Sequence, residues 1–327
     1  MNDIKKESLV NINLRNPNRP AFSNLAKAIK NKEFVITGEL EPKKTTDLSK
    51  VIKSAAKMKP FVVAGNCTDD PQGDANISPL VPSYIVQRDT GLEVVCQMCT
   101  RDRNRTALLG DILSASVLGI KNILCLTGDH SALGDNGGGK PVFDLDSAQF
   151  CYMMSKIVDE GVDLGGNEIK GKVEINFGAV VNPNADPMEP EILKLERKVN
   201  CGVDFIQTQT VFDLDRAKEF LKNCEYLNVP ILVGVFPMKN YGIADYFDKY
   251  IPGVNVPKDV LAALKKTKKK YIPDKAERYA AVDKVNLEFF TPFIKEIRNS
   301  TKAAGIHCMA VEYERLFQPL IERAFPK

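Results

Sequence analysis

Short apolar runs alternate along the chain with longer stretches in which apolar residues recur every three or four positions. Runs of the first kind are typical of buried parallel strands, and the longer stretches are typical of helices that pack one face on a sheet. Eight strand-like runs follow residue 32, and helical stretches separate them. We predict strands at 34–39, 61–64, 92–98, 122–127, 172–180, 205–209, 231–236 and 306–311.

Eight strands that alternate with helices predict an α/β fold, a single (β/α)8 TIM barrel with extra helices. A doubly wound sheet is the alternative, but no G-x-G-x-x-G motif follows the first predicted strand. Residues 1–32 are a lead-in that we expect to pack on the barrel, and residues 33–327 form the barrel. The clearest helical stretches are 22–32, 47–58, 106–118, 144–160, 189–201, 213–227 and 283–304.

Two insertions interrupt the alternation. Residues 131–141 are rich in glycine and follow the fourth predicted strand, which favours a mobile lid or a plain disordered loop about equally. Residues 241–302 are long enough for several helices and contain the basic run from Lys265 to Lys270. That run is typical of a solvated helix end, with a docking patch for an acidic partner as the alternative.

The charge balance and the hydropathy narrow the class of protein. With 45 Lys and Arg residues against 42 Asp and Glu residues, the net charge is +3, which gives no general signal for nucleic acid. No apolar run is long enough to cross a membrane, and the first residues lack the apolar core of a signal peptide. We therefore expect a cytoplasmic protein without membrane insertion.

Metal ligands are few. Cys96 and Cys99 form a C-x-x-C pair, but no second pair follows it, so reduced and buried thiols are the better interpretation of the eight cysteines. His130 and His307 are the only histidines, which excludes a histidine-rich metal centre. We predict no metal site.

Polar side chains follow two neighbouring predicted strands. The fourth strand ends in Gly128, Asp129 and His130, and the third opens into the polar cluster 101–105. The carboxyl ends of the strands of a barrel meet at one rim, where the chemistry of this architecture is done. We therefore expect the functional site at this rim.

The first predicted strand brings two carboxyl groups to the rim. Alternation puts Glu39 and Glu41 on the same side of the strand, roughly 6 to 7 Å apart. If that side is the barrel interior, each carboxylate opposes ionisation of the other, and a dry pocket favours the protonated form, which can act as a general acid. Pairing of these carboxylates with Lys43 or Lys44 is the simpler alternative, and the residues alone favour it.

The sixth predicted strand brings two amides to the same rim. Gln207 and Gln209 share a face, and amides that both donate and accept suit a heterocycle with mixed edges. No G-x-S-x-G elbow is present. Acids, amides and backbone at the rim suit an organic cofactor better than a metal.

Several motifs, in a consistent order from about residue 33 to the C-terminus, together resemble the methylenetetrahydrofolate reductase family. Within the family they look most like the catalytic subunit of the branch found in acetogenic and other anaerobic bacteria. The motifs are Glu39 with Pro42, Thr68-Asp69, and the segments 97–105, 126–130, 140–146, 197–199 and 209–213.

The resemblance implies a barrel that binds flavin and folate and interconverts 5,10-methylenetetrahydrofolate and 5-methyltetrahydrofolate by hydride transfer from flavin N5. By position, Glu39 matches the general acid that protonates N10 of the folate, and Asp129 matches the catalytic acid between flavin and pterin. Gln209 and Phe247 match substrate-binding positions, and Gln207 joins them as the second rim amide. The implied flavin contacts are Thr68, Gln97, Gly128, Asp129, Asn184 and Lys198.

The chain departs from the family pattern at three places. Leu40 and Glu41 stand where many members have an aromatic pair, and Thr127 and Tyr313 stand where other branches have arginine. The lost arginines leave both FAD and FMN open as the cofactor. The resemblance also implies a partner subunit that delivers electrons through iron–sulfur clusters, and a homo-oligomer is an open alternative to a monomer.

Two other functions stay open from the sequence. A pterin-dependent methyltransferase barrel would need no flavin, and a barrel without turnover could serve as a scaffold subunit. The presence of Glu39, Asp129 and Gln209 argues against the scaffold, because a structural subunit has no need for three polar groups at one rim.

Overall fold

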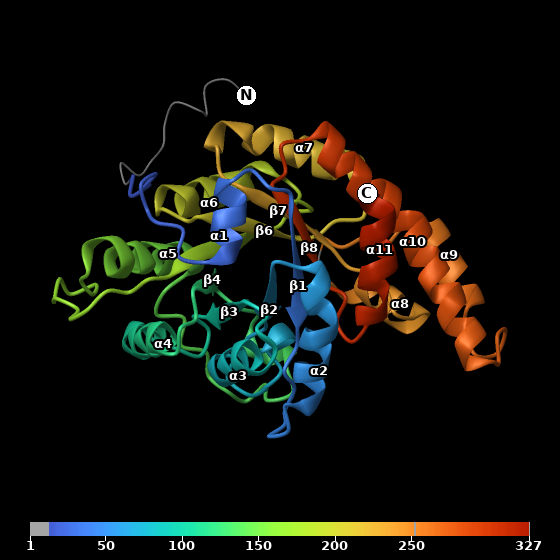
Figure 1. The fold of residues 1–327 in the computed structure, drawn as a ribbon, viewed down its shortest axis with the longest axis horizontal. Helices are drawn as coiled ribbons and strands as arrows, with labels where there is room; N and C mark the ends of the chain where they lie inside the picture. Colours follow the sequence, from blue (N-terminus) through green and yellow to red (C-terminus); the bar gives the residue numbers. More distant parts are fainter. Residues whose placement is uncertain (1–12, 252, 327) are drawn as a thin grey trace.

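The computed structural model describes residues 13–251 and 253–326. Eight parallel strands pair in chain order, and the last returns to the first, so the sheet closes into a barrel (Figure 1). The predicted (β/α)8 TIM barrel is confirmed. The strands are β1 (Val35–Leu40), β2 (Ala64–Cys67), β3 (Val94–Cys99), β4 (Asn122–Leu126), β5 (Asn176–Val181), β6 (Phe205–Thr210), β7 (Ile231–Val235) and β8 (Gly305–Cys308).

Helices surround the barrel, and the later ones extend it to one side, at the right of Figure 1. A large apolar core fills the space between these helices and the outer face of the strands. The helices are α1 (Asn24–Lys30), α2 (Ser49–Met58), α3 (Leu80–Thr90), α4 (Arg105–Val117), α5 (Ser147–Ser155), α6 (Glu189–Asn200), α7 (Leu214–Cys224), α8 (Tyr241–Tyr250), α9 (Lys258–Lys266), α10 (Lys275–Ser300) and α11 (Phe317–Ala324).

The second predicted strand is misplaced in the sequence analysis. Residues Lys59–Phe61, which contain Pro60, form a 3-10 turn, and the strand begins only at Ala64. The four residues of β2, Ala-Gly-Asn-Cys, are all buried although they carry little hydrophobic signal. β2 pairs with β1 on one side and with β3 on the other. Its position inside the closed sheet, and not the hydrophobicity of its own side chains, therefore accounts for its burial.

The amino end of the barrel is closed by apolar side chains. Leu25 and Ala28 of α1 pack against an interior layer to which six strands contribute. Gly178 of β5 leaves room for the ring of Phe205, since a Cβ at residue 178 would lie 2.5 Å from Cε2 of that ring. The layer consists of Val35, Ala64, Val95, Leu124, Phe205 and Leu232.

Both insertions are folded. In the segment 131–141, Asp135 accepts a hydrogen bond of 3.0 Å from the N–H of Ala75 and forms an ion pair with Lys44, so this segment lies against the loops after β1 and β2. Within its described residues, the segment 241–302 contains the whole of α8, α9 and α10. Helix α9 ends at Lys266, so the basic run begins as an exposed helix end, as predicted.

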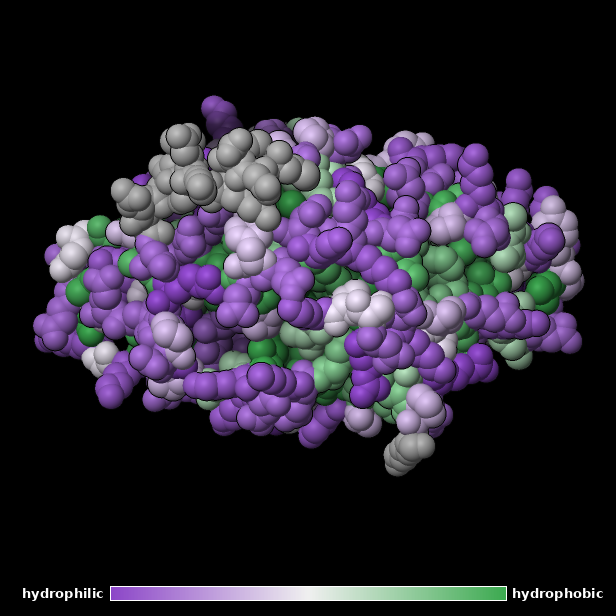
Figure 2. All heavy atoms as spheres, turned by 90° about the horizontal axis from the view of Figure 1, so that it is seen from above, coloured by the Kyte–Doolittle hydropathy of each residue, from purple (hydrophilic) through white to green (hydrophobic). Residues whose placement is uncertain are grey.

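The surface is mixed in character. Figure 2 shows hydrophilic side chains over most of one face, with hydrophobic ones scattered among them. Among the described residues, no helix is both long and apolar enough to cross a membrane.

Candidate functional site

The candidate site lies at the carboxyl end of the barrel, away from the apolar layer under α1. Alternate residues of each strand face the interior, and paired residues on neighbouring strands share a face. The register pairs Glu39 with Asn66 and Thr37 with His307. The interior is therefore polar above the apolar layer, and this polar lining is built on rigid strands.

A chain of hydrogen bonds leads through this interior to Glu39. The amides of Gln207 and Asn66 exchange hydrogen bonds of 2.6 and 3.1 Å, and Gln207 also donates to Thr37 Oγ1 at 3.2 Å. Thr37 Oγ1 lies 2.9 Å from His307 Nδ1, and His307 Nε2 lies 3.4 Å from Glu39 Oε2. The Glu39 side chain is 15% exposed, whereas the other four residues are almost completely buried. Buried residues therefore support the Glu39 carboxyl group on its interior side, and the group is partly exposed at the mouth of the barrel.

The two rim glutamates have different surroundings. Glu41 forms an ion pair with Lys43, which is the alternative that the sequence favoured, whereas Glu39 faces His307. Both line a pocket of about 270 Å³ between β1, α2 and the end of β8. Only Glu39 therefore combines a buried support with access to a ligand.

The two rim glutamines lie at different depths. Gln207 is 1% exposed and its amide is engaged with Asn66 and Thr37, so a folate contact would have to replace these bonds. Gln209 is exposed, and among the described residues its Oε1 accepts only the N–H of Thr210, at 2.8 Å. Gln209 is therefore the amide that is free to donate to a ligand.

Asp129 follows β4 at a sharp turn. Gly128 has a φ of 88°, and a Cβ there would lie 3.1 Å from that of Cys99, so glycine suits both the conformation and the packing. The Asp129 carboxylate accepts the N–H of Gln72 at 2.8 Å, and the Gln72 side chain accepts the hydroxyl of Tyr246 at 3.2 Å. The turn at Asp129 therefore contacts the loop after β2, and that loop contacts helix α8, at the mouth of the barrel.

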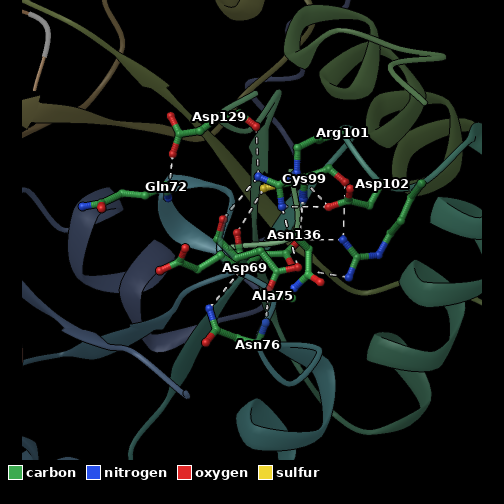
Figure 3. A network of polar contacts seen from close by, with 12 residues as sticks. Asp69, Gln72, Ala75, Asn76, Cys99, Arg101, Asp102, Asp129 and Asn136 are labelled. Carbon is green, nitrogen blue, oxygen red and sulfur yellow. Dashed lines mark hydrogen bonds and ion pairs between the residues drawn. The ribbon is translucent and has the colours of Figure 1, made fainter. Parts of the chain in front are cut away.

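Arg101 is a buried strut under these loops, and Figure 3 shows it between Asp129 and Asp102. Its side chain is 2% exposed. The guanidinium donates to the carbonyls of Asp70 and Asp129, at 3.2 and 3.0 Å, and pairs with the Asp102 carboxylate at 2.7 Å. It therefore ties together the loops after β2, β3 and β4 and fixes the backbone of Asp129.

Aromatic side chains of α8 border the mouth. The ring of Phe247 lies 4.3 Å from that of Phe236, which follows β7. Tyr246, the residue before Phe247, reaches the loop after β2 through Gln72. Phe247 therefore lies on helix α8, which is connected to Asp129 through Tyr246 and Gln72.

Two of the expected cofactor contacts have polar atoms that no protein group satisfies. Thr68 Oγ1 is buried and has no hydrogen-bond partner within the described ranges. The Gln97 side chain is 8% exposed and likewise makes no hydrogen bond to any described residue. A buried polar atom without a partner is costly, so Thr68 fits an organic ligand that offers it a hydrogen bond. The Gln97 amide is likewise available to such a ligand.

Asn184 and Lys198 bond to the backbone of the barrel wall and not to the network around Glu39. The Asn184 amide donates to the carbonyl of Thr210 at 2.8 Å, and the Lys198 ammonium donates to that of Val180 at 2.7 Å. Burial lowers the pKa of Lys198. The flavin contacts expected of Asn184 and Lys198 stay predictions.

The residues that support Glu39 were not predicted from the sequence. Strand alternation already placed Thr37 on the Glu39 face, and His307 lies inside the last predicted strand, so both had a usable signal. Asn66 had none, because its strand was misplaced. Arg101 was recognised only as part of a polar cluster, and its role as a strut depends on loops that meet only in the folded chain.

The fold and the site define the class: a TIM barrel whose mouth gathers a supported glutamate, an aspartate on the loop after β4, and unsatisfied polar atoms from neighbouring strands. The family model of methylenetetrahydrofolate reductase matches residues 24–324, and the chain belongs to this family.

Individual relatives are distant. The 5,10-methylenetetrahydrofolate reductase of Salmonella typhimurium is 27% identical over 168 residues, which is 50% of each chain. That of Pectobacterium carotovorum is 23% identical over 214 residues, which is 63% of this chain and 65% of the relative. The matched part thus spans about half to two thirds of these two relatives.

A solved structure shares the fold. It is an uncharacterized protein from Clostridium thermocellum that binds two copies of 5-methyl-5,6,7,8-tetrahydrofolic acid, with a TM-score of 0.59 and 16% identity. The similarity covers 92% of this chain and 98% of the other. At this identity the similarity supports the barrel fold alone.

Proposed function

We propose that this chain is the catalytic barrel of a flavin-dependent methylenetetrahydrofolate reductase, which interconverts 5,10-methylenetetrahydrofolate and 5-methyltetrahydrofolate. The observation that carries the proposal is the Glu39 carboxyl group, which is open to the mouth and supported by His307 within a chain of this family. A lone, supported carboxyl group is suited to move one proton at a fixed position.

Each mouth residue has a part in this proposal. Glu39 protonates N10 of the folate, so that the five-membered ring opens to a cationic imine. The negative charge of Asp129 favours that cation, Gln209 donates to the pterin, and Phe247 packs against its flat rings. A bound flavin, FAD or FMN, would supply the hydride, and the pterin itself would lie against it.

Thr68 and Gln97 would hold the flavin, because their polar atoms have no partner in the described protein. Gly128 and Asp129 would border it at the turn after β4. These contacts extend the family's pattern to this chain position by position.

We also propose that electrons arrive through a partner subunit with iron–sulfur clusters, as in the anaerobic branch. Neither of the two residues that stand in place of arginine carries a positive charge. Thr127 Oγ1 accepts the N–H of Ser147, and the buried Tyr313 hydroxyl donates to Asp283 at 2.6 Å. A site with fewer fixed cations is less suited to the phosphates of a dinucleotide. The partner and the expected cytoplasmic location stay predictions.

The test is anaerobic bleaching of flavin absorbance in the purified chain after reconstitution with FAD or FMN. We expect 5-methyltetrahydrofolate to bleach the wild type. In this direction the reaction runs in reverse, and Glu39 takes the proton that N10 loses as the ring closes. Glu39→Gln should therefore slow this bleaching by at least 100-fold, because proton transfer by a positioned group contributes about 10²- to 10⁴-fold. Dithionite should still bleach the variant fully, since that reaction needs no folate proton.

Glu41→Gln is the matched comparison, because Glu41 comes from the same segment and is paired with Lys43. It should keep the rate within about fivefold. Loss of bleaching in Glu41→Gln with retention in Glu39→Gln would contradict the assignment of the acid. A chain that binds neither flavin would favour the methyltransferase or scaffold alternative.

A further inference from the structure

The loop after β2 contains a short run of left-handed backbone. Asp70 has a φ of 45°, Gln72 a φ of 60° and Gly73 a φ of 79°. Residues other than glycine rarely adopt a positive φ, because their Cβ then crowds a carbonyl oxygen. The surrounding structure therefore imposes this conformation on Asp70 and Gln72, and backbone strain of this kind is typical of functional sites.

The conformation directs the N–H of Gln72 out of its own loop. The next two N–H groups along the chain donate within the loop, to the carbonyls of Asp70 and Pro71 at 3.0 and 3.2 Å. The N–H of Gln72 donates instead to Oδ2 of Asp129 at 2.8 Å, and Figure 3 shows this bond between the two loops. The strained turn thus presents one N–H to the carboxylate that follows β4.

This hydrogen bond is what orients the Asp129 carboxylate. Within residues 13–251 and 253–326, no other N–H or O–H donates to that carboxylate, and no basic side chain forms an ion pair with it. Asp129 is exposed at the mouth, so packing alone does not fix its side chain. The direction in which its charge points therefore depends on Gln72.

The protein holds both ends of this hydrogen bond. The Arg101 guanidinium donates to the carbonyls of Asp70 and Asp129, so it fixes the two loops relative to each other. On another side of the loop, a Cβ at Gly134 would collide with the carbonyl of Gly73, so the glycine-rich segment packs closely against it. A donor that is fixed in this way keeps its direction, as preorganised electrostatic stabilisation requires.

We propose that Gln72 is a positioning residue for Asp129, and that its backbone N–H holds the carboxylate in the orientation that favours the cationic folate intermediate. The proposal rests on the proposed function, in which the charge of Asp129 favours that cation. The interaction of two charges depends on their separation, so a displaced carboxylate would stabilise the cation less. The role belongs to the backbone of Gln72 and not to its side chain, which accepts the hydroxyl of Tyr246.

Substitutions at residue 72 separate the backbone from the side chain. Gln72→Val introduces a β-branched side chain, for which a positive φ is strongly disfavoured, and should turn the N–H away from Asp129. It should slow the bleaching of reconstituted flavin by 5-methyltetrahydrofolate about tenfold. Gln72→Gly and Gln72→Asn accept left-handed backbone and should keep the rate within about threefold. An equal loss in all three variants would overturn the proposal.

A double-mutant cycle tests whether the effect passes through Asp129. Gln72→Val should slow the wild type about tenfold but slow Asp129→Ala less than about twofold, because no carboxylate is left to orient. Dithionite should bleach every variant fully, since that reaction needs no folate. An equal loss in both backgrounds would mean that the loop has only a structural role and would overturn the proposal.

Amide hydrogen exchange tests the contact itself, on the full chain without flavin or folate. By NMR of the ¹⁵N-labelled chain, the Gln72 N–H should exchange at least about tenfold faster in Asp129→Ala than in the wild type, because its hydrogen bond is lost. Asp144→Ala removes a carboxylate that pairs with Arg105, and should leave this exchange unchanged. Unchanged exchange in Asp129→Ala would overturn the contact and the proposal with it.

Failure of the positioning role and failure of the proposed function give different results. If 5-methyltetrahydrofolate does not bleach the wild type, the proposed function fails, and slow exchange at Gln72 still establishes the contact with Asp129. If Gln72→Val is bleached at the wild-type rate although the amide at residue 72 exchanges fast, the function stands and the positioning role is overturned.

Discussion

The imidazole of His307 links Thr37 to the Glu39 carboxyl group and makes no other side-chain hydrogen bond among the described residues. His307→Asn should therefore slow folate-driven bleaching by roughly tenfold, the equivalent of about 1.4 kcal/mol for one hydrogen bond to a charged group.

Bleaching by dithionite and the melting temperature separate this effect from misfolding. Both should stay close to wild type if His307 acts by positioning Glu39. A slower rate together with a lower melting temperature would mean that His307 has only a structural role.

At the scale of residues, the sequence predicted which side chains share a face but not how deep they lie. Gln207 and Gln209 share a face, yet one belongs to the buried network and the other is exposed. Depth depends on the tilt and stagger of strands in a closed barrel, which alternation does not encode. The same limit hid the contact between Glu39 and His307, which are 268 residues apart.

At the scale of elements, Arg101 holds the mouth loops together. Arg101→Met should lower the free energy of unfolding by about 3 kcal/mol, because it leaves backbone carbonyls and a carboxylate without their charged donor. It should also weaken folate binding, since the backbone of Asp129 loses its support. Urea denaturation and calorimetry measure the two effects.

Arg105→Met is the control, because Arg105 is 52% exposed and pairs with Asp144 at the surface. It should leave the free energy of unfolding almost unchanged, because exposed ion pairs contribute little to stability. Equal destabilisation in the two variants would contradict the role of Arg101 as a buried strut.

The strands with a strong apolar signal were predicted nearly at their observed positions. β2 was misplaced and α3 was not predicted, because β2 is short and small and Pro79 and Pro82 lie at the start of α3. Tertiary contacts, and not local preference, decide such elements. The meeting of loops at Arg101 likewise has no local signature.

At the scale of the whole molecule, all eight cysteines are buried and none is in a disulfide. Burial raises the pKa of Cys96 and of Cys308 to about 12, so at pH 8 roughly one such thiol in ten thousand is a thiolate. We expect the native chain to show almost no reaction with a thiol reagent at pH 8, with reactivity that rises with pH. In denaturant all eight thiols should react, as counted by absorbance.

Cys201 is the most exposed of the eight, at 9%, and should be the first to react. Rapid reaction of any other thiol in the native chain would show that the core opens locally or that the thiol is activated.

The inert thiols make the wild-type chain a ready background for site-specific labelling. A single cysteine introduced at an exposed position, such as Lys269→Cys just after α9 or Tyr250→Cys on α8, would be the one fast-reacting thiol. A fluorophore or spin label could then report on ligand entry at the mouth without removal of any native cysteine.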